Sequence, residues 1–318
     1  MTDRLIVVGQ ITLPAPAADR IRTAAPGFRL VVAPEPDETL IATAEVYAGH
    51  LEPDDIARAG RLRWNHLWTA GADADLSEEM RAADAVVLTS SAGNGAIPLA
   101  EHALLLMLML DRDVPRWLAA QRARTWDRYP HRELAGQTVG IVGMGAAGRD
   151  LAEKCHAFHM RVVGLRGRPT IPAAGVERMY GPEQITQFAA ECDYLVVAAP
   201  LTPTTRGMID QRVFAAMRPT ATIINISRGE IVDDEAMLAA VREHRIAGAG
   251  LDAHRVEPLP ADSPWWTEPG VIVTPHNGAT TPQTVARAVD VFVDNVERYA
   301  QRRPLVNVVD KQSGYAFG

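Results

Sequence analysis

The sequence predicts an α/β protein built from doubly wound parallel sheets in two units. Three observations support this prediction. Short apolar runs alternate with helical patterns along most of the chain, which is typical of βαβ connections. The length of 318 residues exceeds what one small core serves, so two domains are expected. A glycine-rich turn also stands between a strand-like run and a helical pattern in the second unit.

The first unit is predicted from five short apolar runs and the helical patterns between them. Strands are expected at 5–8, 30–33, 45–48, 63–69 and 85–89. Helices are expected at 15–25, 53–59 and 77–82. A turn-rich segment, Ser90 to Gly95, ends this unit of about 100 residues.

The second unit begins with a helical pattern opened by Pro98, whose run ALLLMLML is apolar almost all round and predicts a buried helix. Strands are expected at 138–142, 161–165, 194–199, 222–227, 248–252 and 271–274. Helices are expected at 115–124, 149–159, 182–190, 211–217 and 234–244, followed by an amphipathic helix at 281–300.

Composition excludes several classes of function. The hydrophobic share of 47% and the charged share of 22% are typical of soluble globular proteins. A net charge of −7 without a basic block argues against a nucleic-acid surface, and no run is long enough to span a membrane. The start MTDRLIVVG does not resemble a secretory signal, and Cys155 and Cys192 share no motif. We therefore expect a reduced, cytoplasmic protein with no metal site.

The glycine turn has the spacing G-x-G-x-x-G. Gly143, Gly145 and Gly148 follow the strand at 138–142, and a second strand is expected at 161–165. In this context the first glycine permits a tight turn, the second lets a pyrophosphate approach the backbone, and the third lets the helix pack against the strand. The N–H groups at the start of the helix favour phosphate. The sequence therefore predicts a dinucleotide site.

The tip of the second strand departs from the pattern of an NAD site. An acidic residue is expected there to bind the ribose hydroxyls, but the chain has Leu165-Arg166-Gly167-Arg168. Two guanidinium groups at this position favour a 2′-phosphate, which predicts NADP(H) with NAD(H) as the alternative. Arg166 and Arg168 could also be two solvated loop arginines.

Three segments place reactive side chains after predicted strands of the second unit. Asn225 to Gly229 contains Arg228, Gly250 to Asp252 leads to Glu257, and Thr274 to Gly278 contains His276. Ligands of open α/β sheets bind at the carboxyl ends of the strands. An arginine, a carboxylate and a histidine are thus expected at one edge of the sheet.

These segments together resemble the D-isomer-specific 2-hydroxyacid dehydrogenase family, and among its members the glyoxylate/hydroxypyruvate reductases. The matching stretches are ELAGQTVGIVGMGAAG, AAPLTPTTRGMI, INISRGEIVDDEAML, AGAGLDAHRVEPLP and VIVTPHNGATT. The resemblance covers nearly the whole chain and implies two Rossmann-like domains. The substrate domain would comprise residues 1–97 and 282–318, and the cofactor domain, 98–281, would be inserted into it.

The resemblance also implies roles for single residues. Arg228 would bind the substrate carboxylate and carbonyl oxygen, and His276, paired with Glu257, would be the general acid in reduction and the base in oxidation. Both roles agree with simple chemistry, because arginine binds a carboxylate with a planar fork and histidine exchanges protons near neutral pH.

Weaker correspondences concern the backbone and the cofactor. The N–H groups of Ala70 and Gly71 match the loop that holds the substrate carboxylate, and Asp252 matches a residue that binds the nicotinamide carboxamide. The positions expected to contact the cofactor are Gly143, Gly145, Ala146, Ala147, Gly148, Arg166, Arg168, Ala199, Ile226, Asp252 and His276.

The sequence thus predicts an NADP(H)-dependent reductase of a small 2-keto acid, with glyoxylate or hydroxypyruvate as first candidates. The alternatives are an NAD-dependent dehydrogenase of a larger 2-hydroxy acid such as phosphoglycerate, and a non-catalytic dinucleotide-sensing protein. The family is usually dimeric, so the resemblance implies a homodimer. His102 is expected to be a core histidine, and Trp265 and Trp266 are expected to pack a loop. His254 either touches the active site or fills space.

Overall fold

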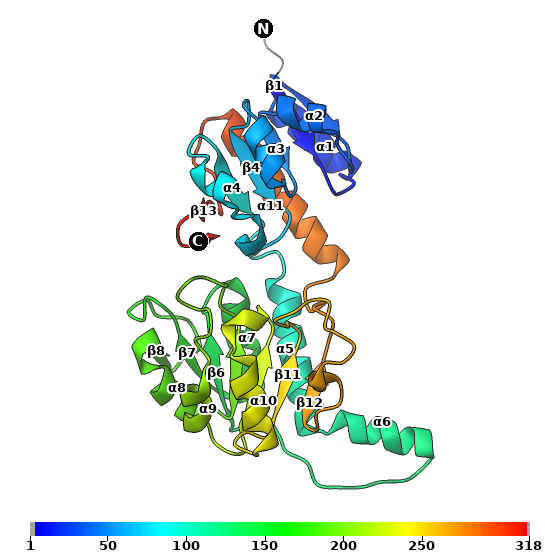
Figure 1. Ribbon diagram of the computed structural model, residues 1–318, viewed down its shortest axis with the longest axis vertical. Coiled ribbons are helices and arrows are strands. Elements are labelled where there is room, and N and C mark those ends of the chain that lie inside the picture. Colours follow the sequence, from blue (N-terminus) through cyan, green and yellow to red (C-terminus); the bar gives the residue numbers. More distant parts are fainter. Residues whose placement is uncertain (1–3, 317–318) are drawn as a thin grey trace. The chain divides into compact units, whose positions relative to one another are not determined.

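The computed structural model describes residues 4–316 and divides into two compact units (Figure 1). Unit 1 contains the chain up to Asn94 and from Thr281 onward, and unit 2 contains Gly95–Thr280. Each unit holds one fully parallel sheet with helices on both faces. The predicted fold class is therefore confirmed. No helix of the described residues is long and apolar enough to cross a bilayer.

The sheet of unit 1 has five strands in the order β2-β1-β3-β4-β5. Their bounds are β1 Arg4–Val8, β2 Phe28–Val32, β3 Val46–Ala48, β4 Trp64–Leu67 and β5 Val87–Ser90. One face packs against α2 Glu38–Thr43, α3 Pro53–Arg58 and α4 Glu78–Ala82. The other face packs against α1 Ala15–Ala24 and α11 Pro282–Ala300. A short 3-10 helix, η1 Asp73–Asp75, and a hairpin of β13 Val309–Asp310 and β14 Tyr315–Ala316 complete the unit.

The sheet of unit 2 has seven strands in the order β12-β11-β10-β9-β6-β7-β8. Their bounds are β6 Thr138–Val142, β7 Arg161–Leu165, β8 Arg178–Tyr180, β9 Tyr194–Val197, β10 Thr222–Asn225, β11 Gly248–Leu251 and β12 Val271–Val273. The strand order reverses between β6 and β9. In open parallel sheets, this switch point opens a crevice at the carboxyl edge, where ligands bind.

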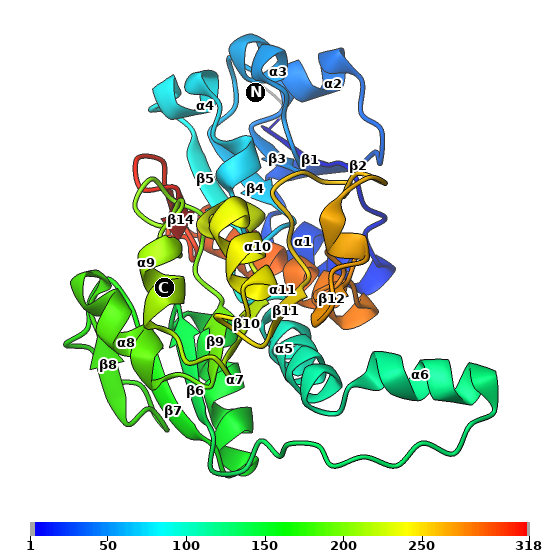
Figure 2. The ribbon, with the colours of Figure 1, turned by 60° about the horizontal axis from the view of Figure 1, so that its bottom comes forward.

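Helices cover both faces of this second sheet (Figure 2). One face packs against α5 Ala96–Asp111 and α7 Ala146–Ala157. The other packs against α8 Ile185–Glu191, α9 Gln211–Ala216 and α10 Asp234–Arg242. The 3-10 helices are η2 Pro182–Gln184, η3 Gly229–Ile231 and η4 Pro264–Trp266. Figures 1 and 2 both show α6 Val114–Ala123 extending from the end of α5 away from the sheet.

Several elements differ from those expected from the sequence, among them the following. Helix α7 begins at Ala146 rather than Arg149, directly after the second glycine of the motif. The edge strand β8 was not expected from its sequence, RMY. Helix α5 is not buried all round, because Leu105 is 48% exposed. Some of its apolar side chains are therefore exposed to solvent, while the others pack into the core.

Candidate active site

The glycine turn has the geometry of a dinucleotide site. Gly143 has a φ of +98°, and a Cβ there would overlap the backbone of Ala199 after β9. A Cβ at Gly148 would overlap the carbonyl of Gly143, so only glycine lets α7 approach the strand this closely. A Cβ at Gly145 would stand in open space. The residues present therefore fit a pyrophosphate above Gly145, facing the N-terminal N–H groups of Ala146 and Ala147.

Arg166 and Arg168 lie directly after β7. The N–H of Arg166 donates to the carbonyl of Tyr180 on β8, which fixes the backbone of the strand tip. The side chain of Arg166 is half-buried and that of Arg168 is exposed. Among Leu165 to Arg168 there is no carboxylate, so the charge at this tip is positive, as a 2′-phosphate requires.

Arg228 is held at the exit of β10 by a buried asparagine. The Asn225 side-chain amide donates to the carbonyl of Arg228 over 3.0 Å, and its side-chain oxygen accepts from the N–H of Ser227 over 3.1 Å. The Ser227 hydroxyl donates to the carbonyl of Ala199, which ties this exit to that of β9. Ile226, between Asn225 and Ser227 in the sequence, is buried, with 4% exposure. The half-buried Arg228 thus has a fixed backbone at the carboxyl edge.

Glu257 and His276 form a hydrogen-bonded pair at the same edge. Nδ1 of His276 lies 2.7 Å from Oε2 of Glu257, and the two side chains are 37% and 36% exposed. A carboxylate only accepts, so Nδ1 carries a proton and donates it. The other ring nitrogen, Nε2, is then the atom that exchanges protons with a ligand. The sequence placed both residues at this edge, and the structure brings them into contact.

Asp252 organises the chain on either side of His276. Its Oδ1 accepts from the Thr274 hydroxyl over 2.7 Å and from the Asn277 N–H over 3.0 Å, and its Oδ2 accepts from the Gly278 N–H over 2.9 Å. Although burial disfavours its charge, hydrogen bonds from His102, Thr274 and Gly278 outweigh burial and hold the pKa of Asp252 well below its ordinary value. The carboxylate is therefore ionised and fixes the loop that carries His276.

His102 belongs to this network. Its Nε2 lies 2.9 Å from the Thr274 hydroxyl and 3.4 Å from Oδ1 of Asp252. It is hydrogen-bonded, as expected of a core histidine, but its partners are those that hold the candidate active site. Helix α5 is thereby connected to the exits of β11 and β12.

Ala70 and Gly71 belong to unit 1, in the loop after β4. The loop is held by the Thr69 hydroxyl, which donates to the Gly71 carbonyl over 2.7 Å, and by the Ser91 N–H, which donates to the Thr69 carbonyl over 2.9 Å. Among residues 4–316, no hydrogen bond uses the N–H of Ala70 or Gly71. These two N–H groups are therefore available to a ligand.

A chain of buried hydrogen bonds supports this loop. Nε1 of Trp64 donates to Oγ1 of Thr89, and the Thr89 hydroxyl lies 2.8 Å from Nδ1 of His66. Nε2 of His66 lies 3.1 Å from the Ser91 hydroxyl, which donates to the Leu67 carbonyl. Because Ser91 donates onward, it accepts from Nε2 of His66, which is therefore the protonated nitrogen. Burial lowers the pKa of His66 to about 3, so the ring is neutral.

Comparisons with known proteins identify the family of the chain. The family model described as D-isomer specific 2-hydroxyacid dehydrogenase, NAD binding domain, matches residues 104–278, more than half of the chain. The chain belongs to this family of NAD(P)-dependent oxidoreductases. The curated relatives include D-3-phosphoglycerate dehydrogenase of Methanocaldococcus jannaschii, 31% identical over 81% of this chain and 49% of that protein. The chain spans about half the length of the phosphoglycerate dehydrogenases that it matches.

Solved structures of family members match both units. A D-isomer specific 2-hydroxyacid dehydrogenase from Xanthobacter autotrophicus in complex with NADPH has a TM-score of 0.83 and 29% identity, covering 99% of this chain and 100% of that one. The NADPH-dependent glyoxylate/hydroxypyruvate reductase of Sinorhizobium meliloti, in complex with NADP, has a TM-score of 0.84 and 27% identity, covering 98% and 100%.

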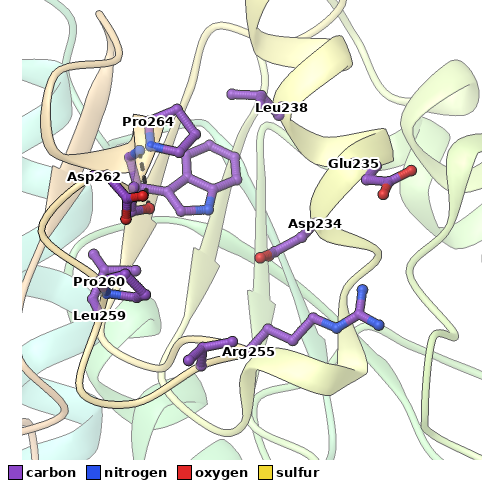
Figure 3. A pocket seen from close by; sticks show the side chains of 11 residues that line it. Asp234, Glu235, Leu238, Arg255, Leu259, Pro260, Asp262 and Pro264 are labelled. Atoms are coloured by element: carbon purple, nitrogen blue, oxygen red, sulfur yellow. Dashed lines mark hydrogen bonds between the residues drawn. The ribbon is translucent and has the colours of Figure 1, made fainter.

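A separate cavity of about 340 Å³ lies beside α10 (Figure 3). Asp234, Arg255, Pro260 and Trp265 are among its lining residues, whereas Arg228, Glu257 and His276 are not. Burial raises the pKa of Asp234. Trp265 is 5% exposed and packs into the core. Nε1 of Trp266 donates to the Pro260 carbonyl. The tryptophan pair therefore fastens this loop, as expected.

Sequence reasoning missed three residues of the site: Asn225, Thr274 and His102 in its observed role. A fourth, His254, for which the sequence left two roles open, contacts the site. All four are polar side chains in buried surroundings at or beside strand exits. A buried polar residue next to a predicted strand end is the signal that could have drawn attention to Asn225 and Thr274.

Neither cysteine belongs to the site. Cys155 and Cys192 are both free and buried. Burial raises the pKa of the Cys155 thiol to about 12, so it is not a nucleophile at neutral pH. Among the described residues, no group of three or more His, Cys, Asp or Glu side chains is arranged to hold a metal ion.

Proposed function

We propose that the chain is an NADP(H)-dependent reductase that converts a small 2-keto acid to the D-2-hydroxy acid. The observation that supports this most is the pairing of His276 with Glu257 at the strand edge that also carries Arg228 and the glycine turn. A proton donor, a cation for a carboxylate and a dinucleotide cradle are what reduction of a 2-keto acid needs.

In this proposal Arg228 binds the substrate carboxylate through its planar fork and polarises the keto oxygen. When bound, the dihydronicotinamide supplies the hydride. The alkoxide charge that develops on the keto oxygen is neutralised by the proton from Nε2 of His276. Glu257 keeps the ring oriented, and it stabilises the imidazolium before the proton leaves.

The proposed cofactor is NADP(H), with NAD(H) as the alternative. Arg166 and Arg168 would bind the 2′-phosphate, while Gly143, Gly145 and Gly148 admit the pyrophosphate. The related crystal structures that hold NADPH or NADP support this choice. Ala199, Ile226 and Asp252 would lie beside the nicotinamide and its ribose. The carboxylate of Asp252 already accepts hydrogen bonds from Thr274, Asn277 and Gly278, and the carboxamide would be an additional partner.

The first test is the oxidation of NADPH and of NADH with a panel of 2-keto acids: glyoxylate, hydroxypyruvate, pyruvate, bulkier aliphatic and aromatic 2-keto acids, and 3-phosphohydroxypyruvate. We expect turnover of the small acids with NADPH. Preference for NADH with the phosphorylated acid would instead support the second candidate, which the similarity to phosphoglycerate dehydrogenases favours. Tight NADPH binding without turnover of any acid would support a sensing role.

The cofactor assignment has its own test. Replacing Arg166 and Arg168 together by serine should raise the KM for NADPH by about 10- to 100-fold, since a charge-assisted hydrogen bond contributes about 1.5–3 kcal/mol. The KM for NADH should not change. Arg245→Ser removes an exposed guanidinium between α10 and β11, at the opposite edge of the sheet, and is the matched control. An unchanged KM for NADPH in the double variant would refute the assignment.

The proposal includes a homodimer formed through α6. None of the ten residues of α6 is buried, and Trp117 and Leu118 are each 44% exposed. Trp126, just beyond the helix, is 90% exposed. Arg116 pairs with Asp127 over 2.6 Å, so this arm has a defined conformation while its apolar side chains stay uncovered. Light scattering after gel filtration should give twice the chain mass, and Trp126→Glu should shift it toward the monomer.

A further inference from the structure

His254 connects the candidate catalytic residues through its side chain. It follows β11 and is 7% exposed. Nε2 of its ring lies 2.9 Å from the carbonyl oxygen of Thr274. A carbonyl oxygen only accepts, so Nε2 carries the proton and donates it. Thr274 stands two residues before His276, and the intervening Pro275 has no N–H to donate. The bond to the Thr274 carbonyl therefore holds the backbone shortly before His276.

The backbone of His254 holds the other member of the pair. Its N–H donates to Oε1 of Glu257 over 2.8 Å, while Oε2 of the same carboxylate accepts from Nδ1 of His276 over 2.7 Å. One residue therefore contacts the chain before His276 and the carboxylate that orients its ring. Through these two hydrogen bonds, His254 holds both Glu257 and the backbone that leads to His276.

A third contact reaches the exit of β10. A Cβ at Gly229 would overlap the backbone carbonyl of His254, so the two segments touch directly. Gly229 follows Arg228. His254 therefore lies between the segments that carry all three candidate catalytic residues, and each of the three contacts uses a different part of it.

His276 needs such support because of its backbone. Its φ is +51°, the left-handed region, which is unfavourable for a residue with a Cβ. After His276, Asp252 holds the N–H groups of Asn277 and Gly278. Before His276, the ring of His254 holds the Thr274 carbonyl. The strained residue is thus fixed on both sides.

We propose that His254 is a positioning residue: the hydrogen bond from its Nε2–H to the Thr274 carbonyl keeps His276 where its ring can donate to Glu257. This inference rests on the proposed function. The role is distinct from filling space, because the ring donates a hydrogen bond to a backbone carbonyl.

Two substitutions separate the hydrogen bond from packing. His254→Phe keeps a ring of similar size and removes the donor, whereas His254→Gln loses the ring and places an amide N–H at a similar distance. We expect His254→Phe to lower kcat for 2-keto acid reduction by about 10- to 100-fold, because small misplacements of catalytic groups have effects of this size. KM and the Kd for NADPH should change little. His254→Gln should keep most of the wild-type kcat. Full activity of the phenylalanine variant, or equal losses in both, would overturn the inference.

Crystal structures of the two variants give a readout that does not need turnover. In His254→Phe, we expect the Thr274–His276 segment to move and the bond from Nδ1 of His276 to Oε2 of Glu257 to break, while His254→Gln keeps it. An unchanged bond in the phenylalanine variant would refute the positioning role. If the wild-type protein reduced no 2-keto acid, the proposed function would fail, and the structures would still decide what His254 does.

Discussion

The buried His66 makes the stability of unit 1 depend on pH in a predictable direction. The ring is fully buried among Trp64, Trp68 and Phe292, and burial lowers its pKa from 6.5 to about 3. Between these two values the unfolded chain binds a proton that the folded protein does not bind. Stability is therefore fully present above pH 6.5 and is lost progressively as the pH falls toward 3.

The size of the effect follows from the shift. One pKa unit corresponds to about 1.36 kcal/mol, so a shift from 6.5 to about 3 amounts to about 5 kcal/mol when fully developed. At pH 5 about 2 kcal/mol of this should already be lost, relative to pH 7. Because a domain is stabilised by only about 5–15 kcal/mol, such a loss is large enough to measure.

The assay is urea unfolding at pH 7 and pH 5, followed by tryptophan fluorescence, for the wild type and for His66→Gln. Glutamine can accept from Thr89 and donate to Ser91 but does not titrate. Between pH 7 and pH 5, the free energy of unfolding of the variant should therefore fall by about 2 kcal/mol less than that of the wild type. His156→Gln, which replaces an exposed histidine, is the control and should follow the wild type. Equal pH dependence of His66→Gln and the wild type would refute the reasoning.

Three further predictions concern the candidate active site. Arg228→Lys keeps the charge but loses the planar fork, so kcat/KM for every 2-keto acid should fall by about 10- to 100-fold, whereas retained efficiency in steady-state assays would remove its role. His276→Gln should leave the Kd for NADPH unchanged in a fluorescence titration and lower kcat by about 10²–10⁴-fold; wild-type turnover would contradict the proton transfer. Gly148→Ala places a Cβ against the Gly143 carbonyl, so it should destabilise the protein by about 1–3 kcal/mol and weaken NADPH binding, and an unchanged melting temperature would show that α7 can shift.

Elements with a strong local pattern were predictable from the sequence. The bounds of β6 and β7 agree with the prediction, because each is an apolar run next to the glycine turn. The start of α7 was placed three residues late, since its N-cap is Gly145, which has no side chain to mark the boundary. Strand β8 pairs with β7 alone, and its short sequence has no apolar run that a pattern could detect.

The candidate site was predictable only in part. Parallel strands bring Arg228, Glu257 and His276 to one edge, and that inference needs nothing but strand order and the resemblance of short segments. The bonds that orient them could not be inferred, because their partners are far apart in the chain. His102 and Thr274 are separated by 172 residues, and no local pattern indicates which acceptor a histidine on α5 will meet.

At this edge, the reactive side chains are exposed and the polar residues that hold them are buried, and catalysis requires both. A side chain that reacts with a substrate has to remain accessible, as His276 and Glu257 are, so burial cannot determine its orientation. Its orientation must come from neighbours that are themselves fixed. Asn225 and Asp252 are 1% and 0% exposed, and they hold the backbone beside Arg228 and His276 through hydrogen bonds that water cannot replace. Substitution of a buried neighbour should therefore impair both stability and catalysis, whereas substitution of an exposed reactive residue should impair catalysis alone.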